Sequence, residues 1–146
     1  MIQTVRSIAK IGERWVIAGC GLAAFGVAFG ALGAHALEAW LPGQFGEEDA
    51  AKRLGYWETG VRYQMYHAIG LVLIGLTPVI RSGARNVAGG LMLLGTILFS
   101  GCLYGWVLTD IQPLVSVVPI GGVCLIISWL AFATGFVIRD RSEDDS

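Results

Sequence analysis

A carboxylate, a guanidinium and an imidazole enter a long apolar run between Glu58 and His67. An ionisable side chain inside a membrane span costs roughly 2.5–3.5 kcal/mol on insertion scales, so its presence indicates a function or a buried partner. Arg62 can hold an anionic group through its planar fork of donors. His67 can exchange a proton near neutral pH. The chemistry that this stretch favours is therefore anion binding or proton transfer.

The spacing of these residues predicts a helix with two polar faces. Glu58 and Arg62 are four residues apart, in the order that favours an ion pair on a helix. Roughly 140° of helical rotation separates Arg62 from His67, and Tyr63 and Gln64 fall on the same face as His67. Lipid satisfies neither face, so at least one must meet another helix or an aqueous pocket.

Each face has two interpretations. Glu58 and Arg62 are either an interfacial anchor beside aromatic residues or part of a binding site. His67 is either a neutral core histidine, hydrogen-bonded to Tyr104, Ser100 or a backbone carbonyl, or a residue that handles protons or a ligand. The sequence leaves both pairs of alternatives open.

At a rise of about 1.5 Å per residue, the expected helices place several polar side chains at a similar depth in the membrane. His35 lies at the end of the first apolar run, where it can pair with Glu38 or Glu58. No nucleophile accompanies these groups, so no catalytic residues are predicted. We expect a candidate polar or ligand site in the outer leaflet, formed by His35, Glu58, Arg62, Tyr63, Gln64, His67, Ser100 and Tyr104.

Cofactor and metal motifs are missing from the sequence. Cys20, Cys102 and Cys124 each stand alone, without the spacing of a metal site or a disulfide framework. No P-loop, dinucleotide-binding fingerprint or haem attachment motif is present. We therefore expect no cofactor and no metal centre.

The elements that carry these residues are membrane helices. The 146 residues are 55% hydrophobic and 14% charged, with a mean hydropathy of +0.66, whereas soluble domains are about 25% charged. Helices of about 20 apolar residues cross a bilayer, and the continuous apolar runs do not alternate as barrel strands do. We predict an all-α integral membrane protein, an antiparallel four-helix bundle with spans at residues 15–37, 60–80, 86–108 and 114–138.

The connections and the basic residues predict an orientation. We expect an outer loop at 38–59, an N-terminal tail at 1–14, an acidic tail at 139–146, and an extended entry at 114–118 before a helix that begins at Pro119. The positive-inside rule places both termini in the cytoplasm and the protein in the inner membrane. A net charge of -1 without a basic patch argues against nucleic acid. The residues on the cytoplasmic side are Arg6, Lys10, Arg14, Arg81, Arg85, Arg139 and Arg141, and those on the outer side are Lys52, Arg53 and Arg62.

A seam of small residues runs along the first apolar helix. Its later members alternate steps of four and three residues, which is the 3.5-residue period of closely packed helices. This pattern favours a structural interface over a ligand role. The helix-packing residues are Gly12, Gly19, Ala23, Gly26, Gly30 and Gly33.

Four motifs in a fixed order mark a resemblance to a known family. They are GALGAHAL (30–37), ETGVRYQMYHA (58–68), LFSGCLY (98–104) and PIGG (119–122). Together they resemble the small four-helix inner-membrane family of unknown function called domain of unknown function 423, which includes YgdD/YwdK-like and transmembrane protein 256-like members. The resemblance covers about residues 16–134. It implies a four-span membrane protein with no established activity.

Two functions of different kinds follow as hypotheses. The leading one is a non-enzymatic accessory or assembly protein, whose packing surfaces engage a larger membrane complex or a second copy of the chain within the lipid bilayer. The alternative is an outer-leaflet pocket protein that binds or moves a small lipid, a quinone or a proton through Arg62 and His67. A membrane enzyme is the least favoured class, because no nucleophile, base and orienting group can be assembled.

Overall fold

Four long helical units make up the part of the chain that the structure describes. The structure is a computed structural model that describes residues 2–78 and 80–144, with side chains placed for residues 12–78, 80, 81 and 83–136. Two of the units contain a π-helical turn, labelled η. In chain order the elements are α1 (Ile2–Leu32), η1 (Gly33–Leu37), α2 (Glu38–Phe45), α3 (Glu47–Leu76), α4 (Ser82–Thr96), η2 (Ile97–Gly101), α5 (Cys102–Thr109) and α6 (Pro113–Asp144).

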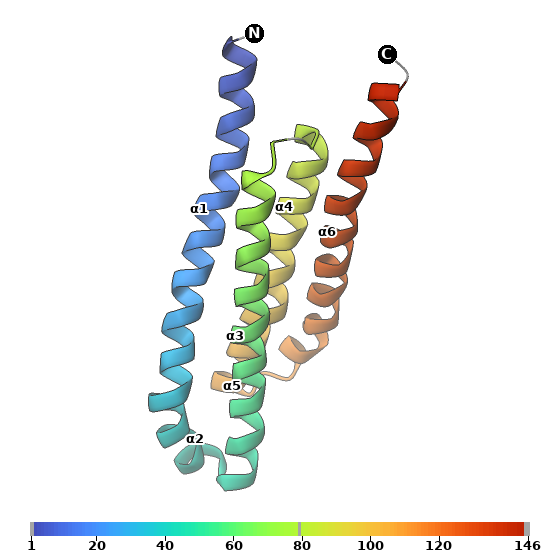
Figure 1. Cartoon of the computed structure of the whole chain (residues 1–146). Coiled ribbons are helices and arrows are strands. Elements are labelled where there is room, and N and C mark those ends of the chain that lie inside the picture. Colours follow the sequence, from blue (N-terminus) through green and yellow to red (C-terminus); the bar gives the residue numbers. More distant parts are fainter. Residues whose placement is uncertain (1, 79, 145–146) are drawn as a thin grey trace.

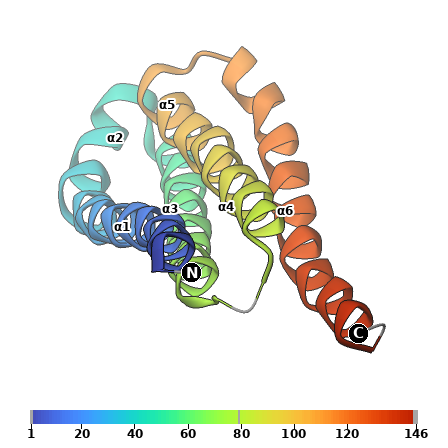
Figure 2. The same cartoon turned by 90° about the horizontal axis from the view of Figure 1, so that it is seen from above.

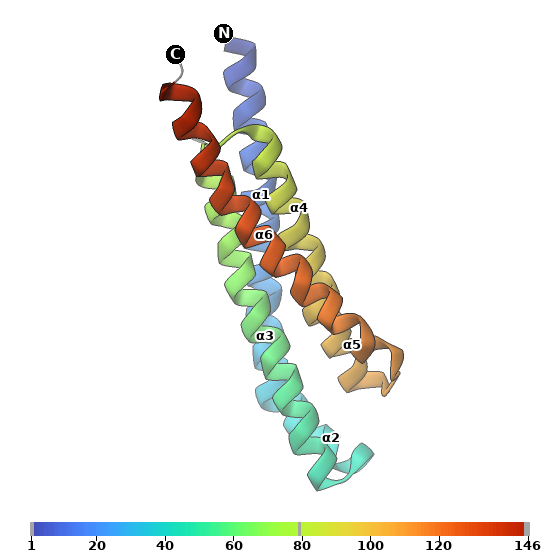
Figure 3. The same cartoon turned by 90° about the vertical axis from the view of Figure 1, so that its right-hand side faces the viewer.

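The helices lie side by side. Both termini lie at one end of the molecule, and the long helices α1, α3, α4 and α6 alternate in direction along the chain (Figure 1). Viewed along the helices, α3 and α4 occupy the middle, with α1 against α3 and α6 against α4 (Figure 2). At the other end, α2 and the start of α3 extend beyond the connection between α5 and α6 (Figure 3).

Three of the described helices are long and apolar enough to cross a membrane, at Gly12–Phe45, Gly83–Thr109 and Pro113–Phe136. The central helix α3 is not among them, because charged residues run through its first half as far as Arg62. It runs from Glu47 to Leu76, so the predicted span at 60–80 begins inside this helix and extends past its end. Three apolar helices thus accompany one helix of mixed character.

The segment 38–59, predicted as the outer connection, is helical apart from one residue. That residue is Gly46, which has φ 81° and separates α2 from α3. A positive φ carries no steric penalty for glycine. The first turn of α3 contains Glu47, Glu48 and Asp49. Acidic side chains at this position are stabilised by the positive end of the helix dipole. The chain therefore turns sharply at Gly46 and continues as helix.

Both predicted tails and the entry to the last helix also differ from the expectation. α1 already begins at Ile2, and α6 continues to Asp144, while Asp145 and Ser146 lie outside the described residues. α6 begins at Pro113 rather than Pro119, and the segment 114–118 is helical, not extended. Pro113 occupies the first helical turn, where backbone N–H groups have no partner within the helix. Proline therefore loses no hydrogen bond there.

The small-residue seam of α1 faces α3. A Cβ atom at Gly12 would lie 2.5 Å from the Gly75 carbonyl oxygen, and one at Gly19 would lie 2.6 Å from the Ala68 carbonyl oxygen. Ala23 on the same helix is half-buried. The missing side chains let the two backbones approach closely, as small residues do between membrane helices.

Candidate functional site

The eight residues of the predicted polar site do not form one cluster. They lie along α3 and on the helices packed against it, and they divide into separate groups with different neighbours. The spacing on α3 correctly separated two polar faces, whereas the residues of the expected site have different neighbours in the structure.

The first group joins α3 to α1 and α5 through Gln64. Its side-chain amide donates to the Leu22 carbonyl oxygen at 2.8 Å, and the Tyr104 hydroxyl donates to Gln64 Oε1 at 3.0 Å. Gly60 makes room for this contact, because a Cβ there would lie 2.7 Å from the Tyr104 ring. Gln64 and Tyr104 are buried. Their polar groups are satisfied within the protein, so this group links helices together.

The second group is His67 with its aromatic neighbours. His67 is 6% exposed, and its Nδ1 lies 2.7 Å from the Tyr63 carbonyl oxygen one turn earlier. Of the alternatives for this histidine, the structure has the bond to a backbone carbonyl. A carbonyl only accepts, so Nδ1 carries a hydrogen. The Tyr63 ring stacks on Phe99 with 4.6 Å between ring centroids, and His67 lies 6.3 Å from the Trp129 ring.

Ser100 and His35 stand apart from both groups. Ser100 is buried in η2, and its hydroxyl has no hydrogen-bond partner among the described residues. His35 is exposed in η1. It forms an ion pair with neither Glu38 nor Glu58, since Arg53–Asp110 is the one ion pair in the described part of the chain. The pairing of His35 with either carboxylate, which the sequence allowed, is therefore not present in the structure.

Glu58 and Arg62 form the third group, on the side of α3 that faces away from His67. Both side chains are exposed, and they do not form the expected ion pair. They lie instead at a cavity of about 260 Å³ between α1 and α3, which we call the α1–α3 cavity. Its other lining residues are Gly30, Gly33, Ala34, Trp57 and Val61.

Arg53 is a buried structural residue whose role the sequence analysis missed, because it assigned position 53 to a loop. The side chain is 4% exposed, and Nη1 donates to the carbonyl oxygens of Trp106 and Val107, each at 3.2 Å. Nη2 forms a hydrogen-bonded ion pair with Asp110. The guanidinium carbon lies 3.7 Å from the Phe45 ring centroid and 4.7 Å from that of Trp106.

This contact caps the C-terminal end of α5. The last carbonyls of a helix lack partners within the helix, and a cation there also opposes the negative end of the dipole. Arg53 thereby ties α3 and α2 to α5. A signal for this role was available, because Ala50, Arg53, Trp57, Gly60 and Gln64 recur at steps of three and four residues, the period of a buried helix face.

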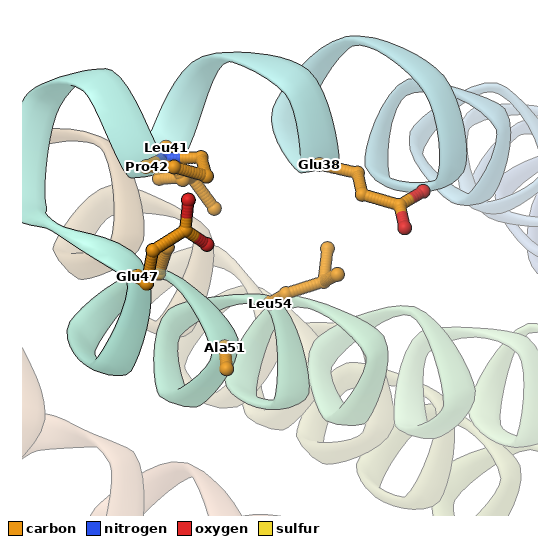
Figure 4. Close-up of a pocket in the computed structure, with 7 residues that line it drawn as sticks. Glu38, Leu41, Pro42, Glu47, Ala51 and Leu54 are labelled. Atoms are coloured by element: carbon orange, nitrogen blue, oxygen red, sulfur yellow. The ribbon is translucent and has the colours of Figure 1, made fainter.

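A second cavity, of about 180 Å³, lies where α2 and α3 meet. We call the segment 38–54 around it the α2–α3 corner. The carboxylates of Glu38 and Glu47 reach into the space between the two helices, Glu47 beside Pro42 and Glu38 on the side of Leu54 (Figure 4). Leu41 is fully buried there. The cavity therefore combines two exposed carboxylates with apolar walls.

A family model described as "Protein of unknown function (DUF423)" matches residues 29–122, which is more than half of the chain. The chain belongs to this family. The match includes α2, α3 and α5, and with them both cavities and the Arg53 contact. The resemblance expected from the four motifs is confirmed.

Relatives in the family are named as membrane proteins. The UPF0382 membrane protein YwdK of Bacillus subtilis is 40% identical over 125 residues, covering 84% of this chain and 95% of that protein. A UPF0382 membrane protein of Staphylococcus haemolyticus is 40% identical over 116 residues, covering 80% of this chain and 88% of that protein. No solved structure matches the chain. These names and the three apolar helices identify the chain as a membrane protein of unknown function.

Proposed function

We propose that this protein is a non-enzymatic accessory protein of a larger membrane complex, and that the α2–α3 corner docks a partner protein. The observation that carries the proposal is the cavity of this corner, in which two carboxylates lie over apolar walls. A lysine or arginine of the partner fits that chemistry, because its stem can lie on the partly exposed Pro42 and Leu54 while its charge meets Glu38 and Glu47.

We further propose that the four helices form an antiparallel bundle in the inner membrane, with both termini in the cytoplasm. The α2–α3 corner then lies outside the cytoplasm. The distribution of basic residues supports this orientation, since Arg14, Arg81 and Arg85 belong to the end of the molecule that also holds both termini. The acidic α2–α3 corner lies at the opposite end.

The rigidity of the corner also supports a docking role. Arg53 holds α3 to the end of α5 through two carbonyls and Asp110, and its guanidinium packs on Phe45 of α2. A surface that is already ordered loses less conformational entropy on binding than a mobile loop does. The position of the corner beyond the α5–α6 connection leaves it accessible (Figure 3).

Site-specific photo-crosslinking in native membranes tests the proposal. A photoreactive amino acid replaces the exposed Ala51 beside the cavity, in otherwise unchanged full-length protein and in a Glu38→Gln, Glu47→Gln variant. We expect one discrete crosslinked protein, whose yield falls at least about tenfold in the variant, as loss of a charge-assisted contact predicts.

The matched control replaces Glu48 and Asp49, which are exposed on the same helix but do not line the cavity. Glu48→Gln with Asp49→Asn removes the same net charge and should leave the yield unchanged. An equal loss in both variants would reduce the effect to net charge and contradict docking in this cavity. A crosslink to a second copy of this chain, or a partner-free protein in mild detergent, would contradict the accessory role.

The alternative of a single pocket that uses Arg62 and His67 is less well supported. His67 is buried beside Trp129 and bonded to its own helix, whereas Arg62 is exposed at the α1–α3 cavity. A ligand at Arg62 would not meet the imidazole. Anion binding and proton exchange, if both occur, would be separate events.

A further inference from the structure

The α1–α3 cavity lies where the seam between its two helices opens. Near the other end of the seam, a Cβ at Gly19 would overlap the Ala68 carbonyl oxygen at 2.6 Å. At Gly30 the only neighbour of an added Cβ is a methyl of Val61, at the ordinary contact distance of 3.6 Å. The helices are therefore too far apart at Gly30 for their own side chains to fill the space.

The inner wall of the cavity is rigid. Trp57 is 2% exposed, and its indole Nε1 donates to the Phe29 carbonyl oxygen at 2.7 Å. Its ring fills the space beside Gly33, where an added Cβ would lie 2.7 Å from Cδ1. Trp57 thus forms a fixed wall that cannot swing in to close the cavity.

Two opposite charges that pair with none of the described residues lie at this cavity. Glu58 and Arg62 are one helical turn apart, and among the described residues neither forms an ion pair or a side-chain hydrogen bond. Their failure to pair with each other leaves a carboxylate acceptor and a guanidinium donor both available. A ligand that carries a cation and an anion a few bonds apart would satisfy both groups at once.

The position of the cavity along α3 matches the headgroup level of a bilayer. The charge-free part of α3 begins directly after Arg62 and continues to Leu76. Tyr56 on α3 and Trp40 on α2 are exposed large aromatic side chains near the same end of the molecule. Such residues are typical of the interface between headgroups and hydrocarbon.

The geometry points to a binding site for a zwitterionic membrane phospholipid with a primary ammonium, of the ethanolamine type, in the α1–α3 cavity. Arg62 receives the phosphate and Glu58 receives the ammonium. The apolar wall at Val61 and Gly30 lies against the glycerol end, from which the acyl chains continue into the bilayer. This inference does not depend on the docking role of the α2–α3 corner.

The two charges also select among lipids. A headgroup with a phosphate but no ammonium leaves Glu58 without a partner and brings a second negative charge near it. A choline headgroup has a cation but no N–H, so it cannot donate a hydrogen bond to the carboxylate. Ethanolamine is the headgroup of the three that satisfies both side chains with charge-assisted hydrogen bonds.

Native mass spectrometry of the full chain in mild detergent tests the site. The protein is equilibrated with equal amounts of phosphatidylethanolamine, phosphatidylglycerol and phosphatidylcholine that carry the same acyl chains. We expect phosphatidylethanolamine to be retained about tenfold over each competitor. Arg62→Gln should lower its retention about tenfold, and Glu58→Gln should abolish the preference over phosphatidylglycerol.

Matched variants distinguish the contribution of the cavity to lipid binding from that of the two charges and from loss of folding. Gly30→Leu fills the cavity and should remove the bound lipid. Gly21→Leu on the same helix should leave the lipid bound, because no atom lies within 4 Å of a Cβ added at Gly21. Glu48→Gln on α3 controls for loss of an exposed carboxylate. Circular dichroism and size-exclusion chromatography confirm that each variant is folded before it is compared.

Several results would overturn the inference. Equal retention of the three lipids by the unchanged protein would do so, as would a preference that survives Gly30→Leu. A preference for phosphatidylglycerol that depends on Arg62 but not on Glu58 would assign an anionic lipid instead. Displacement of the lipid by an equal concentration of soluble phosphoethanolamine would assign a free ligand rather than a membrane component.

Discussion

Arg53 and Arg62 lie on the same helix but have opposite environments. Arg53 is buried, with its guanidinium between two aromatic rings and bonded to two carbonyls and to Asp110. Arg62 is exposed beside a cavity, and no described residue pairs with it. The neighbouring element, not the residue type, therefore decides whether a charge near a membrane holds the fold together or is left for a ligand.

The two regions differ in how their helices meet. At Arg53, the end of α5 presents the carbonyls of Trp106 and Val107, and the guanidinium donates a hydrogen bond to each. At Arg62, the nearest helix is α1, whose glycines present no polar side chain to pair with it. The first region is therefore closed and structural, and the second is open.

The strongest test of this contrast is to replace each arginine by methionine. Arg53→Met removes three hydrogen bonds at the buried end of α5, including the ion pair with Asp110, so we expect the free energy of unfolding to fall by about 2–3 kcal/mol. Arg62→Met should change it by less than about 0.5 kcal/mol. Unfolding in mixed micelles with increasing sodium dodecyl sulfate, followed by tryptophan fluorescence, measures both values. Similar losses for the two variants would refute the contrast.

A smaller effect should distinguish the closed and open parts of the α1–α3 seam. Gly19→Ala places a Cβ against the Ala68 carbonyl and should lower the free energy of unfolding by about 1–2 kcal/mol. Gly30→Ala meets only ordinary contacts and should leave it unchanged or raise it by up to about 1 kcal/mol, since alanine favours helix. The same micelle titration measures both, and a loss at Gly30 as large as that at Gly19 would argue that the cavity is closed.

The smallest expected effect concerns the hydrogen bond that links α3 to α5 through Gln64 and Tyr104. Tyr104→Phe removes the hydroxyl that donates to Gln64 Oε1 and should lower the free energy of unfolding by about 1 kcal/mol. Tyr56→Phe is the matched control, because that tyrosine is exposed and has no side-chain hydrogen bond among the described residues. An unchanged stability of Tyr104→Phe, measured in the same way, would argue that this bond does not hold α3 to α5.

The site was only partly predictable from the sequence. Helical spacing alone separated the face of Arg62 from that of His67, and this separation is present in the structure. It did not identify the partner of Gln64, because Leu22 lies 42 residues away on another helix. Nor did it predict that Glu58 and Arg62 stay unpaired, since side-chain direction depends on what packs around the turn.

The bounds of the helices were also only partly predictable from the sequence. The apolar runs correctly indicated all-helical membrane segments, but the charged residues 47–59 were misread as a loop. In the structure they continue α3, because one side of this charged segment, at Ala50, Arg53 and Trp57, is buried against neighbouring elements. Hydropathy averages over all sides of a helix, so it does not detect a helix with one buried face.

By itself, the sequence determined that this chain is an all-helical membrane protein of its family, because hydropathy and local motifs depend only on residue order. Which charges became structural and which stayed open was decided by the tertiary structure. The end of α5 lies against Arg53 and a gap in the α1 seam lies against Arg62, and both depend on how helices distant in sequence pack. Residue spacing along one helix carries no information about the polar groups that another helix brings to it.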